Sequence, residues 1–355
     1  MPTIRSGTRV HTRSKGAQVI VTDYINPLVL QRADPFVLRD DRADGVQYYF
    51  TGSYPRYDRI TLRRAARLDA LQAAPEKTIW RAHSSGPLSH LIWAPELHRV
   101  AGTWTVYFAA APDTKISDDT FNHRIYCLQC EDDDPLTGTW IERGLVDTGD
   151  TFSLDATTFT RDGVQYLVWA QQDLAIEGHS NIYIARMSNP WTLADRPSLL
   201  SHPELDWERV RFAVNEGPAV LIHDNRIFLT YSASGTGPEY AVGLLRADLR
   251  ADLEDPNSWT KSAQPIFKSA PDAHQYGPGH NSFTTSENGA DDLIVYHARN
   301  YTEIVGDPLF DPNRHARIGR VTWDEQGSPQ FGRPAPDTRW TPTSTEIITG
   351  KGAEI

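Results

Sequence analysis

Three carboxylates, Asp34, Asp155 and Glu216, stand at similar places in three separate stretches of the sequence. Each stands 14 to 16 residues before the last aromatic residue of a run of aromatic and β-branched residues, an offset that a repeated structural unit would produce. Two carboxyl groups that flank an acetal can hydrolyse it, because one protonates the leaving oxygen while the other activates water or attacks. A third carboxylate near the acid raises the pKa of that acid by like-charge repulsion. The set could therefore supply a base, an acid and a modulator of the acid.

The aromatic runs recur five times along the chain. Their last aromatic residues, which stand 58 to 65 residues apart, are Phe50, Phe108, Trp169, Tyr231 and Tyr296. At the matching offset, the two repeats without a carboxylate carry the tripeptide at 93–95 and His280. Turn-forming residues and further β-rich runs surround the aromatic runs, so each repeat resembles a small antiparallel sheet.

This pattern predicts an all-β fold, a five-bladed β-propeller, because such a fold repeats four-stranded sheets radially. A pair of packed sheets is the main alternative, but it does not explain the regular spacing. Inner strands line the channel of a propeller, so the three carboxylates should meet in one pocket, where their repulsion favours a chemical role over a structural one. We expect one catalytic domain over residues 1–355, with 17–30 as the outer strand that helps to close the ring and 332–355 as a surface tail.

Composition narrows the possible partners. The 355 residues carry a net charge of −11, which disfavours nucleic acid and anionic membranes as partners and suits a neutral substrate. No stretch approaches the roughly 18 apolar residues of a membrane span, and the N-terminus lacks the apolar core of a signal peptide. The expected location is therefore cytoplasmic, or secreted if a leader was removed, and the expected state is a monomer. Cys127 and Cys130 are interpreted as ordinary strand residues, since no further zinc ligands accompany them.

Five short segments together resemble glycoside hydrolase family 43, a family of inverting five-bladed propellers. They are spread over roughly residues 25 to 325, nearly the whole chain, and they are 32–37 (RADPFV), 92–98 (IWAPELH), 153–159 (SLDATTF), 214–220 (VNEGPAV) and 277–283 (GPGHNSF). The resemblance implies that Asp34 is the general base, Asp155 the pKa modulator and Glu216 the general acid. Glycoside hydrolase family 62, which shares the fold and the acid triad, is a close neighbour.

Two segments, 52–64 and 92–98, resemble the α-L-arabinofuranosidases of the family more than its β-xylosidases. The expected activity is the release of terminal α-L-arabinofuranosyl units, with inversion, from arabinan or arabino-oligosaccharides. The alternatives are a β-xylosidase or an endo-arabinanase on the same scaffold, or a sugar-binding propeller without catalysis. No cofactor is expected to take part in the chemistry.

Further residues are candidates for the site. The resemblance places His280 near the axis, where it could help to hold a calcium or another structural ion; the alternative is a core histidine. Trp93 could stack on a sugar or simply pack between blades, and Tyr54 could reach the sugar from a loop or be an exposed turn residue. Arg317 resembles an arginine that pairs with the acid or the substrate. The remaining candidates are Asn281, Tyr57, His297 and Arg299.

Overall fold

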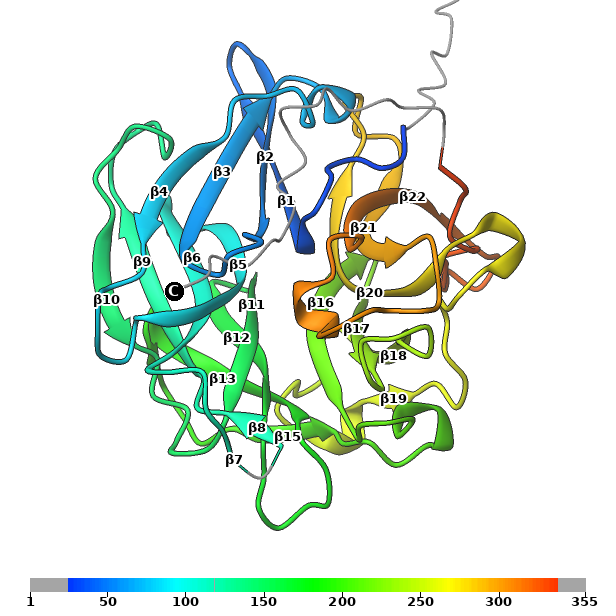
Figure 1. Cartoon of the computed structure of the whole chain (residues 1–355). Helices are drawn as coiled ribbons and strands as arrows, with labels where there is room; N and C mark the ends of the chain where they lie inside the picture. Colours follow the sequence, from blue (N-terminus) through cyan, green and yellow to red (C-terminus); the bar gives the residue numbers. More distant parts are fainter. Residues whose placement is uncertain (1–24, 118, 338–355) are drawn as a thin grey trace, which may run out of the picture.

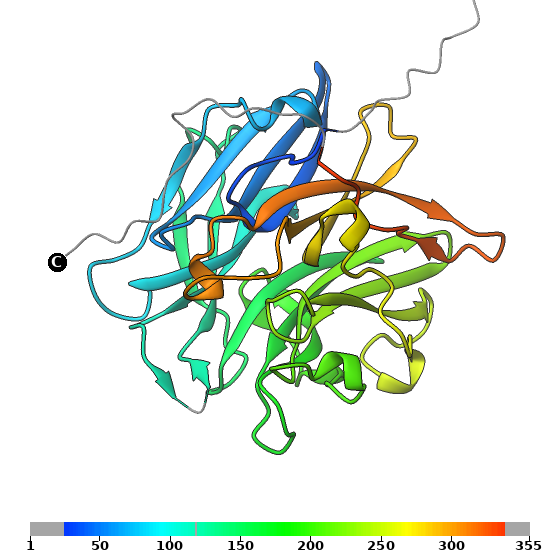
Figure 2. The ribbon, with the colours of Figure 1, turned by 45° about the vertical axis from the view of Figure 1, so that its right-hand side comes forward.

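The structure is a computed structural model that describes residues 25–117 and 119–337. Within this part of the chain, the long strands form five antiparallel sheets arranged around a central axis, so the protein is a five-bladed β-propeller as predicted (Figure 1). The colours follow the chain around the ring, and the sheets remain separate blades after a 45° turn (Figure 2).

In each of the five blades, the first strand in chain order is the one nearest the axis. Blade 1 contains β1 (Ala33–Arg42), β2 (Gly45–Ser53), β3 (Arg59–Ala65) and β4 (Lys77–Arg81). Blade 2 contains β5 (His90–Val100), β6 (Thr103–Ala111), β9 (Arg124–Cys130) and β10 (Ile141–Leu145). Blade 3 contains β11 (Ser153–Arg161), β12 (Val164–Gln171), β13 (Asn181–Asn189), β14 (Thr192–Leu193) and β15 (Ser198–Ser201).

The remaining two blades follow the same plan. Blade 4 contains β16 (Asn215–His223), β17 (Arg226–Ala233), β18 (Ala241–Asp248) and β19 (Thr260–Lys261). Blade 5 contains β20 (Tyr276–Thr285), β21 (Asp292–Arg299), β22 (His315–Trp323) and β23 (Pro329–Gln330). A small hairpin of β7 (Ile116–Ser117) and β8 (Thr120–Phe121) projects from blade 2.

The five aromatic runs form the second strand of each blade. Their side chains are buried on both faces of the sheet, because every blade packs between two neighbours; Tyr48, Tyr49 and Phe50 are all at most 1% exposed. This two-sided burial explains why the runs are continuously apolar and do not alternate with polar residues. Cys127 and Cys130 lie buried in β9 as free thiols, in agreement with their interpretation as strand residues.

A β-bulge interrupts the start of every inner strand. The pairing register shifts at the same place in β1, β5, β11, β16 and β20. Each bulge holds one residue with a positive φ, and these residues are Asp34 (54°), Ala94 (44°), Asp155 (57°), Gly217 (53°) and His280 (43°). A bulge re-aims side chains next to it, so these five bulges set the directions of the groups around the axis.

The positions of the bulges show that the three carboxylates do not occupy equivalent positions in their repeats. Asp34, Asp155 and His280 occupy the left-handed position itself, whereas in blade 4 that position belongs to Gly217 and the acid Glu216 stands one residue earlier. Glu216 is therefore equivalent to Trp93 and not to the other two carboxylates. Glu216 therefore reaches the pocket from a different position of its bulge than Asp34 and Asp155 do.

The ring closes where blade 5 packs against blade 1. Ser282 donates a hydrogen bond of 2.8 Å to the Pro35 carbonyl across this junction. Of the segment 17–30, residues 17–24 lie outside the described part, while Val29 forms a single bridge with Ala316 at one end of β22. At the other end of β22 the fourth strand of the blade is β23, so the outer edge of the blade has two contributors.

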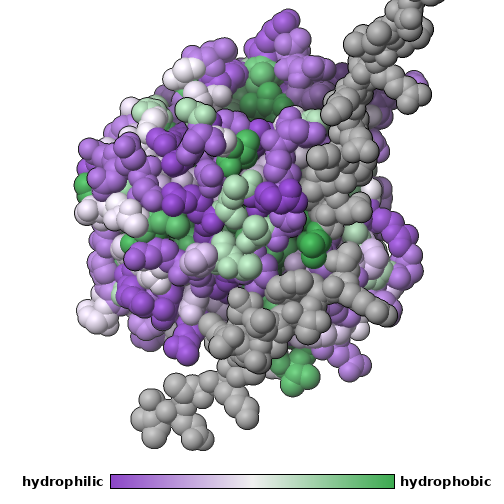
Figure 3. Space-filling view, turned by 90° about the horizontal axis from the view of Figure 1, so that it is seen from above, coloured by the Kyte–Doolittle hydropathy of each residue, from purple (hydrophilic) through white to green (hydrophobic). Residues whose placement is uncertain are grey.

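The visible part of the face in Figure 3 is mainly hydrophilic, with hydrophobic residues in small groups. Among the residues that the structure describes, none belongs to a helix long and apolar enough to cross a bilayer. Of the expected tail 332–355, only 332–337 is described, and its Asp337 accepts a hydrogen bond from Arg317.

Substitution of Gly243 by alanine should destabilise the fold. A Cβ at Gly243 in β18 would overlap the ring of Tyr231, its cross-strand neighbour. Overpacking of this kind costs about 1–3 kcal/mol. A matched control is Gly319→Ala in β22, where the new Cβ would lie 3.3 Å from Ile294 and needs only a small adjustment. Urea unfolding should show the larger loss of stability for Gly243→Ala, and equal losses would contradict this packing argument.

Candidate active site

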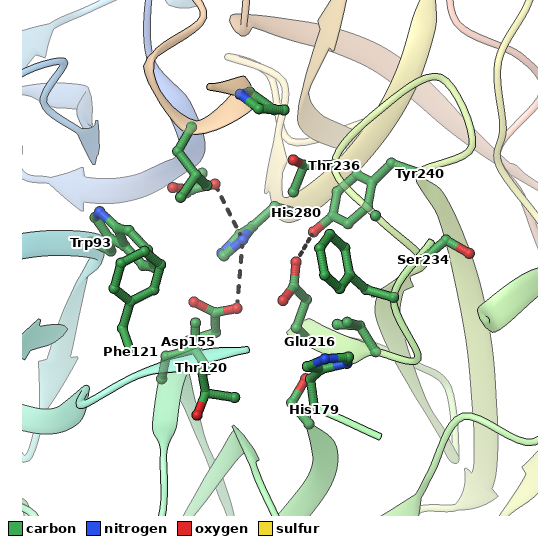
Figure 4. A pocket seen from close by; sticks show the side chains of 18 of the residues that line it. Trp93, Thr120, Phe121, Asp155, His179, Glu216, Ser234, Thr236, Tyr240 and His280 are labelled. Atoms are coloured by element: carbon green, nitrogen blue, oxygen red, sulfur yellow. Dashed lines mark hydrogen bonds and ion pairs between the residues drawn. The ribbon is translucent and has the colours of Figure 1, made fainter. Parts of the chain in front are cut away.

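One pocket of about 340 Å³ opens at the end of the axis where the inner strands begin. Asp34, Asp155, Glu216 and His280 converge in it from four blades. Figure 4 shows the last three of them. Its walls are largely apolar, and they include Trp93, Phe121, Phe152, Phe212 and Leu309. A small concave site with a few convergent charged groups and apolar walls is the usual form of a ligand pocket.

Asp34 is held as a carboxylate. Its side chain is 12% exposed, and burial alone would raise its pKa. Nearby positive charge, chiefly from His280 and Arg314, outweighs burial and brings the pKa of Asp34 down to about 2. The hydroxyl of Ser53 donates to Asp34 Oδ2 and accepts from the backbone N–H of Ala94 at 2.9 Å, which ties the bulges of blades 1 and 2 together.

His280 lies between two of the carboxylates. Its Nδ1 is 3.3 Å from Asp34 Oδ1 and 3.8 Å from Asp155 Oδ2. Dashed lines in Figure 4 mark both contacts. The described residues contain no group of three or more His, Cys, Asp or Glu side chains that could ligate a metal, so the role of His280 at an ion stays a prediction. The contacts that the structure shows for the His280 ring are those with the two carboxylates.

Asp155 and Glu216 behave as a coupled pair of buried acids. Burial raises the pKa of Asp155 well above its ordinary value, and the charges of Glu216 and Asp34 raise it further. The backbone N–H of Gly217 donates 3.0 Å to Asp155 Oδ2 and opposes this rise. When two acids interact this strongly, the two observed pKa values describe the pair as a whole and not either residue alone. At neutral pH the pair therefore retains protons that Asp34 has lost.

Burial also raises the pKa of Glu216, to about 7. The hydroxyl of Tyr240 donates 2.8 Å to Glu216 Oε1 and lowers the pKa, while the charge of Asp34 raises it (Figure 4). Glu216 is thus a carboxyl group that carries a proton near neutrality and can release it. The pocket combines this proton donor with Asp34, whose carboxyl group is ionised at neutral pH.

The loop between β21 and β22 forms one wall of the pocket. The buried Arg314 donates to the Tyr57 hydroxyl at 2.6 Å and to the Leu309 carbonyl at 2.8 Å. From the other side, Arg299 donates 2.9 Å to the Pro308 carbonyl and pairs with Asp311 at 3.2 Å. Two buried arginines therefore fix the loop, and with it Pro308 and Leu309, which line the pocket.

The other candidate residues divide into two groups. Trp93 lines the pocket, where its indole stacks on His123 with ring centroids 4.2 Å apart, so it serves blade packing as well as the wall. Tyr57 and His297 also line the pocket. Tyr54, Asn281 and Arg317 lie outside its lining.

These three residues have other surroundings in the structure. The ring of Tyr54 contacts the guanidinium groups of Arg32 and Arg59, which lie 5.0 Å and 4.6 Å from its centroid. Asn281 is 1% exposed, and its side-chain amide has no partner among the described atoms. The fully buried Arg317 donates to Asp337 and to Asn300 Oδ1, away from the acids.

Sequence reasoning missed Arg314 and Tyr240. Arg314 precedes Arg317 by three residues, a spacing that changes the face of a strand, and nothing in the sequence distinguishes which of the two reaches the pocket. Tyr240 directly precedes β18 in a segment without a motif, yet its hydroxyl contacts Glu216. Only the packing of blade 4 against blade 5 shows its role.

The chain is similar to several known α-L-arabinofuranosidases. An extracellular exo-α-(1→5)-L-arabinofuranosidase of Streptomyces avermitilis is 48% identical over 332 residues, which cover 93% of this chain and 67% of that protein. An enzyme of the same name from Streptomyces chartreusis is 52% identical over 80% of this chain and 85% of its own length. The crystal structure of an α-L-arabinofuranosidase from Lactobacillus brevis has a TM-score of 0.87 at 52% identity, over 89% of this chain and 98% of that one.

Other relatives are longer than the matched region. The chain spans 64% of the length of α-L-arabinofuranosidase 43 of Humicola insolens, with which it is 49% identical. The expected cytoplasmic location is wrong on this comparison, because both Streptomyces relatives are named as extracellular enzymes, which points to a secreted protein. The absence of an apolar leader was too weak a signal to decide the compartment.

The family model described as Glycosyl hydrolases family 43 matches residues 24–329, which contain all five blades up to the start of β23. The convergence of two buried acids and one permanent carboxylate on the axis is the arrangement that the resemblance implied. With this match and relatives near 50% identity, the chain belongs to glycosyl hydrolase family 43.

Proposed function

We propose that this protein is an inverting exo-α-L-arabinofuranosidase that releases terminal α-L-arabinofuranosyl units from (1→5)-linked arabinan and arabino-oligosaccharides. The observation that carries the proposal is the contrast in one pocket between Asp34, with a pKa of about 2, and Glu216, with a pKa of about 7. Inverting hydrolysis needs such a pair, one group ionised and one protonated. The names of the Streptomyces relatives supply the sugar and the linkage.

In this mechanism Asp34 accepts a proton from water as the water oxygen bonds to the anomeric carbon. The bond from that carbon to the leaving oxygen breaks, and Glu216 gives its proton to the leaving oxygen. Attack from the opposite face inverts the anomeric configuration. His280 and Arg314, which face Asp34, keep the base ionised before water arrives.

Asp155 has a supporting role. Its repulsion with Glu216 and its burial keep the pair partly protonated, and its hydrogen bond from Gly217 fixes the backbone next to the acid. The net charge of −11 agrees with a neutral polysaccharide as the partner. The wall formed by the loop from Arg299 to Arg314 agrees with attack at a chain end, where only one terminal sugar must enter.

The direct test is hydrolysis of 4-nitrophenyl α-L-arabinofuranoside, with 4-nitrophenyl β-D-xyloside as the competing substrate. We expect much higher kcat/KM on the arabinofuranoside, release of single arabinose units from linear arabinan, and the β-anomer as the first product in proton NMR. Preference for the xyloside, or long fragments from arabinan, would replace this proposal by a β-xylosidase or an endo-arabinanase. No hydrolysis of any substrate would favour a sugar-binding propeller.

The two proposed catalytic carboxyls should respond differently to the leaving group. Glu216→Gln should retain substantial activity on the nitrophenyl substrate, because a good leaving group needs little protonation, and should lose it on arabino-oligosaccharides. Asp34→Asn should lose roughly 10²-fold or more on both, because water must be activated in either case. Comparison of kcat/KM for both variants on both substrates checks this. Rescue of Asp34→Asn by the activated substrate would reverse the two roles.

Tyr240→Phe should move the alkaline limb of the pH–rate profile to higher pH. The Tyr240 hydroxyl stabilises the carboxylate form of Glu216, so its loss raises the pKa of Glu216 above about 7. A general acid works while it is protonated, and a higher pKa therefore extends activity into alkaline solution. The measurement is kcat/KM against pH on an arabino-oligosaccharide. The control Tyr183→Phe removes a hydroxyl bonded to Asp173 outside the pocket and should leave the limb in place; an unshifted limb in Tyr240→Phe would contradict the assignment.

A further inference from the structure

His297 connects the base to the interior of the pocket. It lies on β21 opposite Gly279, its residue is 1% exposed, and it contributes to the pocket lining. The ring stacks on Tyr240 with centroids 5.8 Å apart and an interplanar angle of 12°. The mechanism above gives His297 no role, although it contacts the residue that activates water.

One ring nitrogen of His297 holds the backbone of Asp34. The N–H of Asp34 donates a hydrogen bond of 3.2 Å to Nδ1. Because a backbone N–H only donates, Nδ1 must be the unprotonated nitrogen of the ring. This contact anchors a residue in the left-handed conformation, with φ of 54°, which a side chain other than glycine adopts at a cost.

The surroundings of His297 keep the ring neutral. Burial holds the pKa of His297 well below its ordinary value, and the positive charges of Arg314 and Arg299 act in the same direction. The carboxylate of Asp34, with Oδ1 at 3.7 Å from Nδ1, opposes them, and His280 lies near as well. With Nδ1 accepting and the ring neutral, the single ring proton sits on Nε2.

This Nε2–H is a buried donor without a partner among the described atoms. Arg314 also lines the pocket, and its Nε is likewise buried without a partner among the described atoms. Buried donors are rarely left unpaired, because each costs about 1–3 kcal/mol of desolvation. Two such donors beside Asp34 indicate that an acceptor oxygen from a ligand completes this part of the pocket.

We propose that the Nε2–H of His297 donates a hydrogen bond to a hydroxyl oxygen of the arabinofuranosyl unit in the pocket, while Nδ1 holds the backbone of the base. One neutral imidazole then sets the position of the sugar relative to Asp34. The identity of the sugar rests on the proposed function. The proposal makes His297 both a substrate-binding residue and a positioning residue for Asp34.

Two substitutions separate the two nitrogens. In His297→Asn the amide oxygen can replace Nδ1 as acceptor for Asp34, but nothing reaches the place of Nε2. In His297→Gln the amide nitrogen can replace the Nε2–H donor, but the contact with Asp34 is lost. We expect His297→Asn to raise KM for 4-nitrophenyl α-L-arabinofuranoside more than it lowers kcat, and His297→Gln to lower kcat more than it raises KM.

Deoxy substrates identify the contact. On the wild-type enzyme, removal of the hydroxyl that binds Nε2 from the 2-, 3- or 5-position should lower kcat/KM about 3- to 10-fold more than it does on His297→Asn, which has already lost the contact. The intrinsic reactivity of each deoxy sugar cancels in this comparison. The same loss on both enzymes for all three deoxy substrates would overturn the substrate contact.

Nitrogen-15 NMR of the histidine rings tests the Asp34 contact without any substrate. The wild-type protein should show His297 as a single neutral tautomer with its proton on Nε2, without titration between pH 5 and 9. A proton on Nδ1, or titration near the ordinary pKa, would overturn the assignment even if neither variant folds. A wild-type enzyme that is inactive on every arabinofuranoside would overturn the proposed function and the sugar contact, while the NMR result would still decide how Asp34 is held.

Discussion

The left-handed residue at the start of each inner strand is the constraint on which the site depends. Five bulges with φ between 43° and 57° break the pairing at the same register and direct side chains around the axis. Asp34, Asp155 and His280 hold this conformation at an expected cost of about 1–3 kcal/mol each. Packing of the aromatic second strands between neighbouring blades stabilises the ring and so over-determines these positions.

Burial and local charge together give the three carboxyl groups different pKa values. Burial raises the pKa of Glu216 and of Asp155, and without positive neighbours it would do the same to Asp34. Asp34 lies 3.3 Å from His280 and 4.0 Å from Arg314, and these positive neighbours place its pKa about five units below that of Glu216. The propeller achieves opposite protonation states within one pocket by placing the basic groups on blade 5, next to blade 1.

The repeat spacing was sufficient to predict five blades and the meeting of the three carboxylates, because both follow from periodicity alone. The one-residue offset of Glu216 could not be predicted, since it depends on where each bulge falls and not on the motif. Arg314 and Tyr240 were missed for a related reason: each lies in a loop just before a strand, where no repeat fixes the direction of a side chain. Arg317, which the motif suggested, lies on β22 and donates a hydrogen bond to Asp337 instead of contacting the acids.

Blade 2 has the same bulge as the others, but its left-handed position carries only the methyl group of Ala94. Its backbone amide still takes part in the site through the hydroxyl of Ser53, which bonds Asp34. The five blades therefore share one backbone template, while the reactive groups differ from blade to blade. In evolutionary terms the scaffold and the chemistry are separable, and a family built on this ring can exchange a reactive group by a point change in a single blade without redesigning the fold.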